Sequence, residues 1–215
     1  MTVNLITLTE PRSAAAEAYR ALRTNILFSG IEKPITTLLI TSAASSEDKS
    51  IAIANLAVTL AQSGSRTIIV DADLRRPAQH TIWGIDNTRG LSAMMLDDAT
   101  LASPPLVATS VEHLSVLPSG ALPPVPSDVL SSQRMTEIIG VLKARASFVL
   151  FDAPPVLAAT DAVILGARLD AVVLTARAGA ARRDQLARAA QTLRRVNVRF
   201  LGVVLTNAPR EMRAY

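Results

Sequence analysis

The chain has 215 residues and a formal net charge of +4; 49% of its residues are hydrophobic, 3% are aromatic and none is cysteine. This composition predicts one domain with a sizeable core, and it excludes a disulfide framework or a thiolate metal site. Because no uncharged apolar stretch reaches the ~18 residues of a membrane-spanning helix and no basic-then-apolar leader opens the chain, we expect a cytoplasmic protein.

Short runs rich in Val, Ile and Leu alternate with helical patterns along the whole chain. The runs lack period-two alternation, which is typical of strands buried on both faces. They lie at 37–41, 67–70, 114–117, 148–151, 171–175 and 201–205. The helical patterns lie at about 13–28, 49–62, 91–97, 128–143, 161–167 and 182–196. This order predicts an α/β domain over residues 1–215, with a parallel β-sheet that has helices on both faces.

The first helical pattern, at about 13–28, carries Glu17, Arg20 and Arg23 at positions i, i+3 and i+6. Side chains at this spacing share one broad face of a helix. The sequence leaves two interpretations open for this face. It is either an exposed stripe of ion pairs or a contact between subunits.

The first strand is followed by a segment with the outline of a phosphate loop, which normally reads G-x-x-x-x-G-K-[ST] between a strand and a helix. Ala43 and Asp48 occupy the two glycine positions, and Lys49 and Ser50 follow. Lys49 would neutralise phosphate charge, Ser50 would ligate Mg²⁺, and the helix start would direct free N–H groups at the phosphates. The remaining predicted nucleotide contacts in this segment are Ser46, Glu47 and Ile51.

Carboxylates follow two further predicted strands. Asp71 and Asp73 come after the second strand and lie on one side of the extended chain, and Asp152 ends the fourth. Carboxylates in such places suit Mg²⁺ and a water or hydroxyl group that is to be polarised. Because ligands of parallel sheets bind at the carboxyl ends of the strands, we expect Lys49 and the three aspartates to meet at one edge.

Several segments together carry a family resemblance. They are residues 17–25 (EAYRALRTN), 71–77 (DADLRRP), 90–92 (GLS), 117–120 (LPSG), 123–130 (PPVPSDVL) and 152–155 (DAPP). In this combination the chain resembles the cytoplasmic domain of the bacterial tyrosine kinases of capsule and exopolysaccharide synthesis. These kinases belong to the wider group of deviant-Walker partition and division-site ATPases.

The resemblance implies a Rossmann-like P-loop domain that binds Mg-ATP and phosphorylates tyrosines of a neighbouring subunit in a ring. It implies catalytic roles for Lys49, Asp71 and Asp73, and a metal site at Ser50, Asp71 and Asp152. It places Asn207 where related ATPases read adenine, and it identifies residues 17–23 as the oligomerisation motif. The implied partner is a membrane polysaccharide co-polymerase, or chain-length regulator, which would hold the chain at the inner face of the cell membrane.

The phosphate loop departs from the family pattern. Where the family reads roughly P-G-E-G-K-[ST], residues 45–50 read SSEDKS, so both glycines are missing. Glycine lets backbone N–H groups approach a phosphate without a Cβ in the way. A carboxylate ~4 Å from a phosphate charge would cost about 4 kcal/mol at an effective dielectric of ~20, or roughly a thousandfold in affinity. We therefore expect ATP and Mg²⁺ binding to be weakened.

The same loop has a structural alternative. Ser45 and Asp48 have the spacing of a helix capping box. Asp48 would then place its own carboxylate at the helix N-terminus, where a nucleotide would place a phosphate. In this interpretation the loop is closed by its own anion.

The basic residues and the tyrosines give weaker signals. Many arginines lie late in the chain and fit a solvated helix face, an anionic membrane surface or an acidic partner. Nucleic acid is a poorer fit, because 3% aromatic residues supply few stacking platforms. Of the two tyrosines, Tyr19 lies within the first helical pattern and fits core or interface packing, and Tyr215 is a possible phosphoacceptor.

Three functional hypotheses follow. The first is a tyrosine kinase-like ATPase domain that regulates exopolysaccharide or capsular polysaccharide synthesis or export, with reduced ATP binding. The second is a catalytically inactive pseudokinase scaffold of the same system, which keeps the fold but has lost ATP turnover together with the loop glycines. The third is a partition-type ATPase, which would need a DNA-binding patch or an amphipathic helix after residues 201–205.

Overall fold

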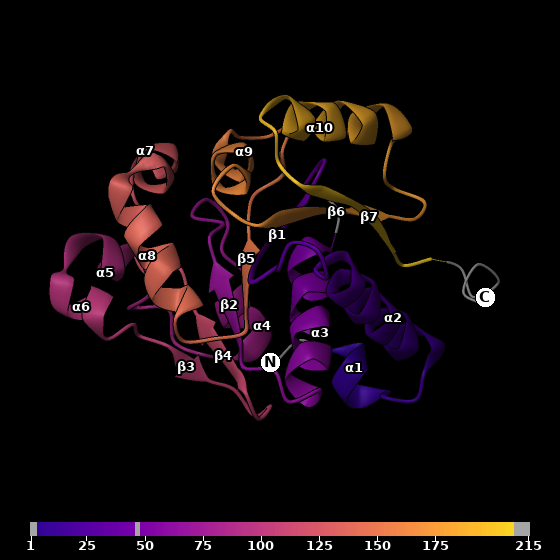
Figure 1. The fold of residues 1–215 in the computed structure, drawn as a ribbon, viewed down its shortest axis with the longest axis horizontal. Helices are drawn as coiled ribbons and strands as arrows, with labels where there is room; N and C mark the ends of the chain where they lie inside the picture. The colour runs from indigo at the N-terminus through magenta and orange to yellow at the C-terminus, as the bar shows by residue number, and fades with distance from the viewer. Residues whose placement is uncertain (1–3, 46–47, 209–215) are drawn as a thin grey trace.

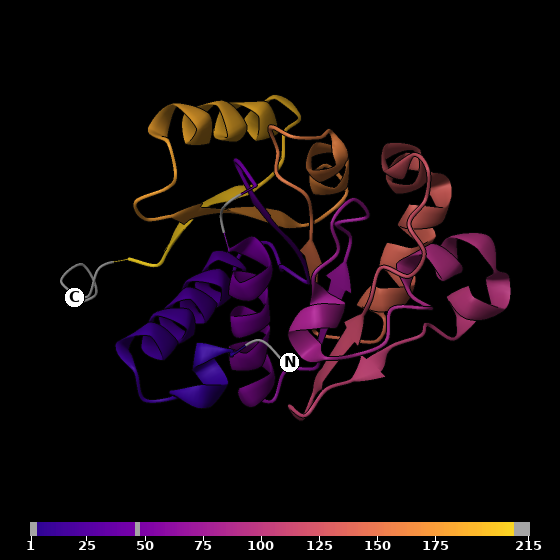
Figure 2. The ribbon, with the colours of Figure 1, turned by 180° about the vertical axis from the view of Figure 1, so that it is seen from behind.

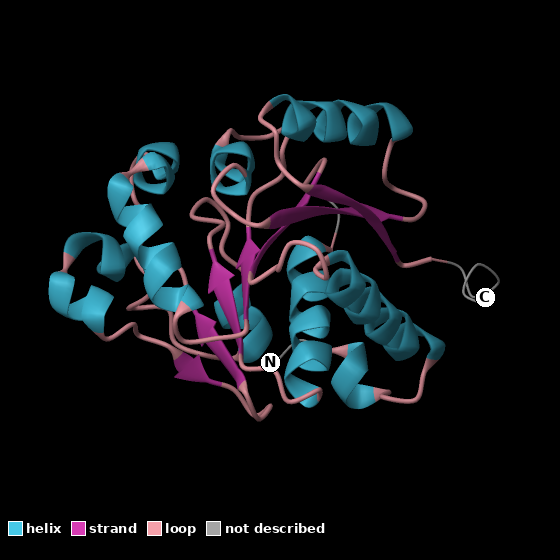
Figure 3. Cartoon of the chain, viewed as in Figure 1, coloured by secondary structure: helices cyan, strands magenta, loops and turns pink. Residues whose placement is uncertain are grey.

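The computed structural model describes residues 4–45 and 48–208. Its centre is a seven-stranded sheet in the order β3-β4-β2-β5-β1-β6-β7. Figure 3 draws the strands in magenta. The strands are β1 (Thr37–Ser42), β2 (Thr67–Asp71), β3 (Val107–Ala108), β4 (Leu114–Leu117), β5 (Phe148–Asp152), β6 (Ala171–Arg177) and β7 (Phe200–Thr206). All neighbouring pairs are parallel except β3 with β4. The parallel sheet expected from the sequence is confirmed, and β3 was missed because two residues carry no periodic signal.

Helices cover both faces of this sheet (Figures 1 and 2). On one face lie α1 (Ile6–Thr9), α2 (Ala14–Ser29), α3 (Lys49–Gln62) and α4 (Gln79–Trp83). On the other lie α5 (Leu91–Leu96), α6 (Asp98–Ala102), α7 (Pro126–Ser131), α8 (Gln133–Lys143), α9 (Asp161–Gly166) and α10 (Arg183–Arg195). Within the described ranges, no helix has the length and apolar character needed to cross a membrane.

Helix α3 begins within the phosphate-loop segment, and most of the helix is buried in the core. Its residues from Ala52 to Ala61 are all buried, because the sheet lies on one side of the helix and α1 and α2 lie on the other. A helix that is largely apolar all round is stable only when it is covered in this way. Asn55, a polar residue in this stretch, accepts hydrogen bonds from the Thr7 backbone N–H (3.0 Å) and hydroxyl (2.8 Å), and so fixes α1 to α3.

The helical pattern expected at 128–143 forms two helices rather than one. Helix α7 ends at Ser131, and the Ser132 hydroxyl accepts a hydrogen bond from the Met135 N–H (3.3 Å) as the N-cap of α8. A serine in mid-pattern is compatible with a helix, but its side chain competes for backbone donors and favours a cap. The short helices α1, α4 and α6 were also missed, since none has more than five residues.

Two of the segments that carry the family resemblance, 90–92 and 117–120, pack against each other. The Leu91 N–H donates to the Pro118 carbonyl (2.8 Å) and the Ser92 N–H to the Ser119 carbonyl (3.0 Å), so the start of α5 lies against the loop after β4. A Cβ on Gly90 would lie 2.0 Å from the Pro118 oxygen and 2.6 Å from the Gly120 nitrogen. Glycine is required at position 90 by this close approach of two backbones.

We expect Gly90→Ala to destabilise the fold by about 3 kcal/mol, because the added methyl group overlaps backbone atoms that cannot rotate away. The matched control is Gly140→Ala in α8, where an added Cβ has no neighbour within 4 Å. The control should stabilise the protein by about 0.5–1 kcal/mol, since alanine favours the helix. Urea unfolding of both variants measures the difference, and equal midpoints would contradict the packing argument.

Candidate functional site

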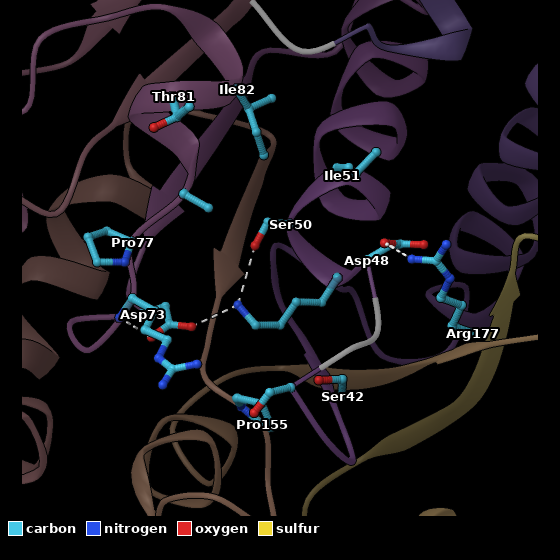
Figure 4. A pocket seen from close by; sticks show the side chains of 14 residues that line it. Ser42, Asp48, Ser50, Ile51, Asp73, Pro77, Thr81, Ile82, Pro155 and Arg177 are labelled. Atoms are coloured by element: carbon cyan, nitrogen blue, oxygen red, sulfur yellow. Dashed lines mark hydrogen bonds and ion pairs between the residues drawn. The ribbon is translucent and has the colours of Figure 1, made fainter. Parts of the chain in front are cut away.

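The predicted site residues meet at the carboxyl edge of the sheet. Asp71 at the end of β2 and Asp152 at the end of β5 are directly paired in the strand register. The Lys49 ammonium donates to Asp152 Oδ1 (2.8 Å) and to Asp73 Oδ2 (2.9 Å). Figure 4 shows the Asp73 carboxylate and the Ser50 hydroxyl pointing into the cavity at this edge. The expected convergence of Lys49 with the three aspartates is therefore present.

Lys49 is held between two carboxylates in a nearly dry setting. Its side chain is 12% exposed, and those of Asp73 and Asp152 are 4% and 0% exposed. Burial lowers the pKa of Lys49, but the charges of Asp152 and Asp73 outweigh it and raise the pKa above its ordinary value. Lys49 is therefore a permanent cation that neutralises buried acidic charge.

Asp71 is the acidic group with an unused oxygen. Its Oδ2 accepts from the N–H groups of Ala78 (2.9 Å) and Gln79 (2.8 Å). Its Oδ1 is buried and has no hydrogen-bond partner within the described chain. Burial, and then the charge of Asp152, raise the pKa of Asp71 to about 8. A buried oxygen without a partner fits a place where a cation or a water binds.

The residues expected to hold a metal fit Mg²⁺ only as a partial ligand set. Across residues 4–45 and 48–208 there is no cluster of three His, Cys, Asp or Glu side chains suited to a metal. The Lys49 ammonium lies 3.3 Å from the Ser50 hydroxyl and 2.8 Å from Asp152 Oδ1. Mg²⁺ commonly takes one or two carboxylates and completes its six ligands from phosphate and water. Ser50, Asp71 and Asp152 could hold the ion in this way, with a nucleotide supplying the rest.

Gln79 and the ion pair between Arg75 and Asp161 support the site, and the sequence analysis missed all three roles. The Gln79 amide donates to Asp152 Oδ2 (2.8 Å) and to the Ser50 carbonyl (3.0 Å), so it joins β5 to α3. Arg75 donates two hydrogen bonds (2.8 and 3.0 Å) to Asp161, whose side chain is fully buried at the start of α9. Asp161 begins α9, and an acidic residue at the start of a helix is a recognisable signal, whereas an isolated glutamine gives none.

Two cavities open at this edge. The first, of about 590 Å³, is lined by Lys49, Ser50 and Asp73 among others (Figure 4). The second, of about 420 Å³, lies beside the end of β7 and is lined by Asn207 and Tyr19. Burial and the nearby Asp48 carboxylate raise the pKa of Tyr19 to about 12, so its phenol stays neutral. The predicted adenine residue and the predicted phosphate residues thus line separate but neighbouring cavities.

The capping-box prediction for Ser45 and Asp48 is wrong. Helix α3 begins at Lys49, and the Asp48 side chain makes no capping hydrogen bond. Instead, Asp48 Oδ1 accepts from the Arg177 guanidinium at 3.1 Å. A charged donor at the end of β6 competes successfully for the carboxylate, because charge-assisted hydrogen bonds are stronger than neutral ones.

The remaining predicted residues occupy varied positions. Ala43 is fully buried, and Ile51 lines both cavities. Ser46, Glu47 and Tyr215 lie outside the described residues.

The predicted oligomerisation residues divide into two groups. Glu17 and Arg20 form an ion pair (2.5 Å) near the surface, and the Glu17 side chain is 68% exposed. Arg23 instead donates to the Thr59 carbonyl (2.8 Å) and so holds α2 against α3. Arg20 also donates to the Pro11 carbonyl, but its pair with Glu17 lies at the surface, so these two residues can take part in a contact outside the domain.

We expect Lys49→Met to destabilise the protein by about 3–5 kcal/mol, because it leaves two buried carboxylates without their cation. The matched control is Lys143→Met, whose partner Asp170 lies 3.4 Å away in a pair exposed to 40% and 22%. Loss of that surface pair should cost less than about 1 kcal/mol. Thermal and urea unfolding measure the loss of stability in both variants, and equal losses would contradict a larger contribution from the buried Lys49 ion pairs.

Comparison with known proteins gives the same family as the sequence motifs. No family model matches the chain. The chain is 40% identical over 202 residues to the tyrosine-protein kinase YwqD of Bacillus subtilis, covering 94% of this chain and 85% of that protein. It is 37% identical to the putative tyrosine-protein kinase CapB of Staphylococcus aureus, covering 93% and 87%.

Solved structures agree. The chimerical protein CapA2B2 superposes with a TM-score of 0.90 at 32% identity, covering 98% of this chain and 93% of that one. The septum site-determining protein MinD of Pyrococcus horikoshii, solved with Mg-ADP, has a TM-score of 0.66 at 22% identity over 83% and 75% of the two chains, and so shares the fold. With relatives of this identity and coverage, the chain belongs to the family of bacterial tyrosine-protein kinases.

Proposed function

We propose that the chain is a tyrosine kinase-like ATPase domain that uses Mg-ATP, with reduced affinity, to regulate exopolysaccharide or capsular polysaccharide synthesis or export. The observation that carries the proposal is the Lys49 ammonium, 2.9 and 2.8 Å from Asp73 and Asp152, with the free Asp71 oxygen on the adjacent strand. The family membership favours this function over a partition-type ATPase.

In this proposal the nucleotide lies across the two cavities. Its phosphates occupy the 590 Å³ cavity beside Lys49 and Ser50, and its base occupies the 420 Å³ cavity beside Asn207. The Lys49 ammonium moves from the carboxylates toward the phosphates, where its charge favours transfer. Bound Mg²⁺ would supply charge neutralisation at the phosphates.

Of the three aspartates at the strand ends, Asp73 lines the open cavity, whereas Asp71 and Asp152 are fully buried. Its Oδ1 is fixed by the N–H groups of Arg75 (3.3 Å) and Arg76 (2.9 Å). Its Oδ2 is released when Lys49 moves to phosphate, and it can then accept the proton of an incoming tyrosine hydroxyl. Asp73 is therefore proposed as the group that orients and activates the acceptor.

Reduced affinity follows from the loop chemistry. Ser46 and Asp48 stand where the family has glycines, so fewer backbone donors reach a phosphate and one carboxylate is added beside Lys49. The pseudokinase scaffold is the second candidate, and the same Asp48 carboxylate favours it. Nucleotide binding and turnover separate the two functions.

A ring-like homo-oligomer and a membrane polysaccharide co-polymerase as partner, holding the chain at the inner face of the membrane, are part of the proposal. The exposed pair of Glu17 and Arg20 supports the subunit contact. So do three exposed apolar residues near the end of α2: Leu27 (46%), Phe28 (67%) and Ile31 (72%). Grouped apolar side chains of this size on a surface commonly mark an interface.

We expect weak binding of Mg-ATP and Mg-ADP, and the double variant Ser46→Gly with Asp48→Gly should bind at least about tenfold more tightly. The physical reason is that backbone donors are restored and a misplaced charge is removed. Calorimetric titration measures affinity, phosphate release measures turnover, and a gain of phosphate on Tyr215 would mark kinase activity. The control Glu112→Gly removes an exposed carboxylate from a turn before β4, at the opposite edge, and should change nothing.

Two results would contradict parts of this proposal. Low-micromolar binding by the unmodified chain, equal to that of the double-glycine variant, would show that Asp48 is no obstacle. Absence of nucleotide binding in every variant would remove the ATPase proposal and leave the scaffold.

For the oligomer, we expect Glu17→Ala with Arg20→Ala to reduce the mass in solution, measured by light scattering at high protein concentration. The control is Arg182→Ala with Asp184→Ala, an exposed ion pair at the start of α10 with 70% and 59% exposure. If the unmodified chain is already a monomer, or if both variants keep its mass, the proposed contact is wrong.

A further inference from the structure

An ion pair separates the two cavities of the proposed nucleotide site. Arg177, the last residue of β6, donates to Asp48 Oδ1 at 3.1 Å. Both side chains line the 590 Å³ cavity and also the 420 Å³ cavity. A nucleotide with its phosphates at Lys49 and its base at Asn207 would pass directly beside this pair. The inference below therefore rests on the proposed function.

Asp48 and its neighbour Lys49 form ion pairs that point in different directions. Lys49 turns toward Asp73 and Asp152 at the ends of the central strands. Figure 4 shows Asp48 and Arg177 pointing toward each other, on the opposite side of the cavity from Asp73. The Asp48 carboxylate is therefore drawn toward β6, although it is adjacent in sequence to the lysine that would hold phosphate.

Arg177 is the cation that balances Asp48. Lys49 is committed to two other carboxylates, and the neighbouring Tyr19 phenol is neutral. The Asp48 and Arg177 side chains are 30% and 43% exposed, so their pairing is reversible and partly screened by solvent. Without the guanidinium, the Asp48 carboxylate would lose the positive charge paired with it and would repel a bound phosphate more strongly.

We propose that Arg177 is a positioning residue for nucleotide binding, which holds the Asp48 carboxylate away from the phosphate site and offsets its charge. The glycine position of the loop can then carry an aspartate and still admit an anionic nucleotide. Arg177 acts through Asp48 in this proposal, and its effect on affinity should depend on the presence of the Asp48 charge.

A double-mutant cycle on the full chain tests this dependence, with Mg-ADP as the probe and calorimetric titration as the measurement. Arg177→Met keeps the apolar stem and removes the charge, and it should weaken binding by roughly threefold to tenfold. In the Asp48→Asn background the same change should alter affinity by less than about twofold. Arg177→Lys, which keeps the charge, should stay within about threefold of the unmodified chain.

The control is Arg182→Met, which removes an arginine that pairs with Asp184 and lines neither cavity. It should leave affinity unchanged and so exclude a general effect of net charge. If the Arg177→Met variant does not fold, the Mg-ADP affinities of Arg177→Lys and Arg177→Gln are compared instead.

Three results would overturn the inference. An equal loss in the unmodified chain and in the Asp48→Asn background would mean that Arg177 contacts the nucleotide itself. Tighter binding by Arg177→Met would mean that the ion pair blocks the site. If the Asp48→Asn variant and the double-glycine variant also bind no Mg-ADP, the proposed function itself fails, and the inference fails with it.

Discussion

The buried contact of Lys49 with Asp73 and Asp152 is the interaction on which the rest of the site depends. It brings together α3, the segment after β2 and the end of β5, with nitrogen–oxygen distances of 2.9 and 2.8 Å. Buried carboxylates are costly unless they are paired, so this arrangement exists only if all three segments arrive in register. The parallel pairing of β2 with β5 supplies that register by placing Asp71 directly beside Asp152.

The surrounding structure keeps these segments in place by polar contacts rather than by the core alone. Gln79 joins the Asp152 carboxylate to the backbone of α3, and Arg75 joins the segment after β2 to Asp161 on α9. These contacts connect helices on both faces of the sheet to the same edge. Asp152 and Asp161 are thereby held in place before any ligand binds.

The sequence predicted the fold and the central constellation because both depend on local patterns. Buried parallel strands have a recognisable composition, and the rule that ligands bind at strand carboxyl ends was sufficient to bring Lys49 together with Asp71 and Asp152. Contacts between distant segments were not predictable in the same way. Arg177 lies 129 positions from Asp48, and a capping box was the only local explanation for the aspartate. The Gly90 contact was seen as a motif, but its cause is the approach of Pro118.

The charges of the site also indicate which form of nucleotide suits it. Three carboxylates, Asp71, Asp73 and Asp152, surround one ammonium, and burial raises the pKa of Asp71 to about 8, which favours its neutral form near neutral pH. Even with Asp71 neutral, two carboxylates outweigh Lys49 at the strand ends themselves, although Arg76 adds a positive charge to the lining of the cavity. A divalent cation would reverse this balance and favour the ionised form of Asp71 at the same time. In the proposed function, the carboxylates at the strand ends therefore favour a nucleotide that arrives with its metal ion, whereas the Asp48 charge is offset by its ion pair with Arg177.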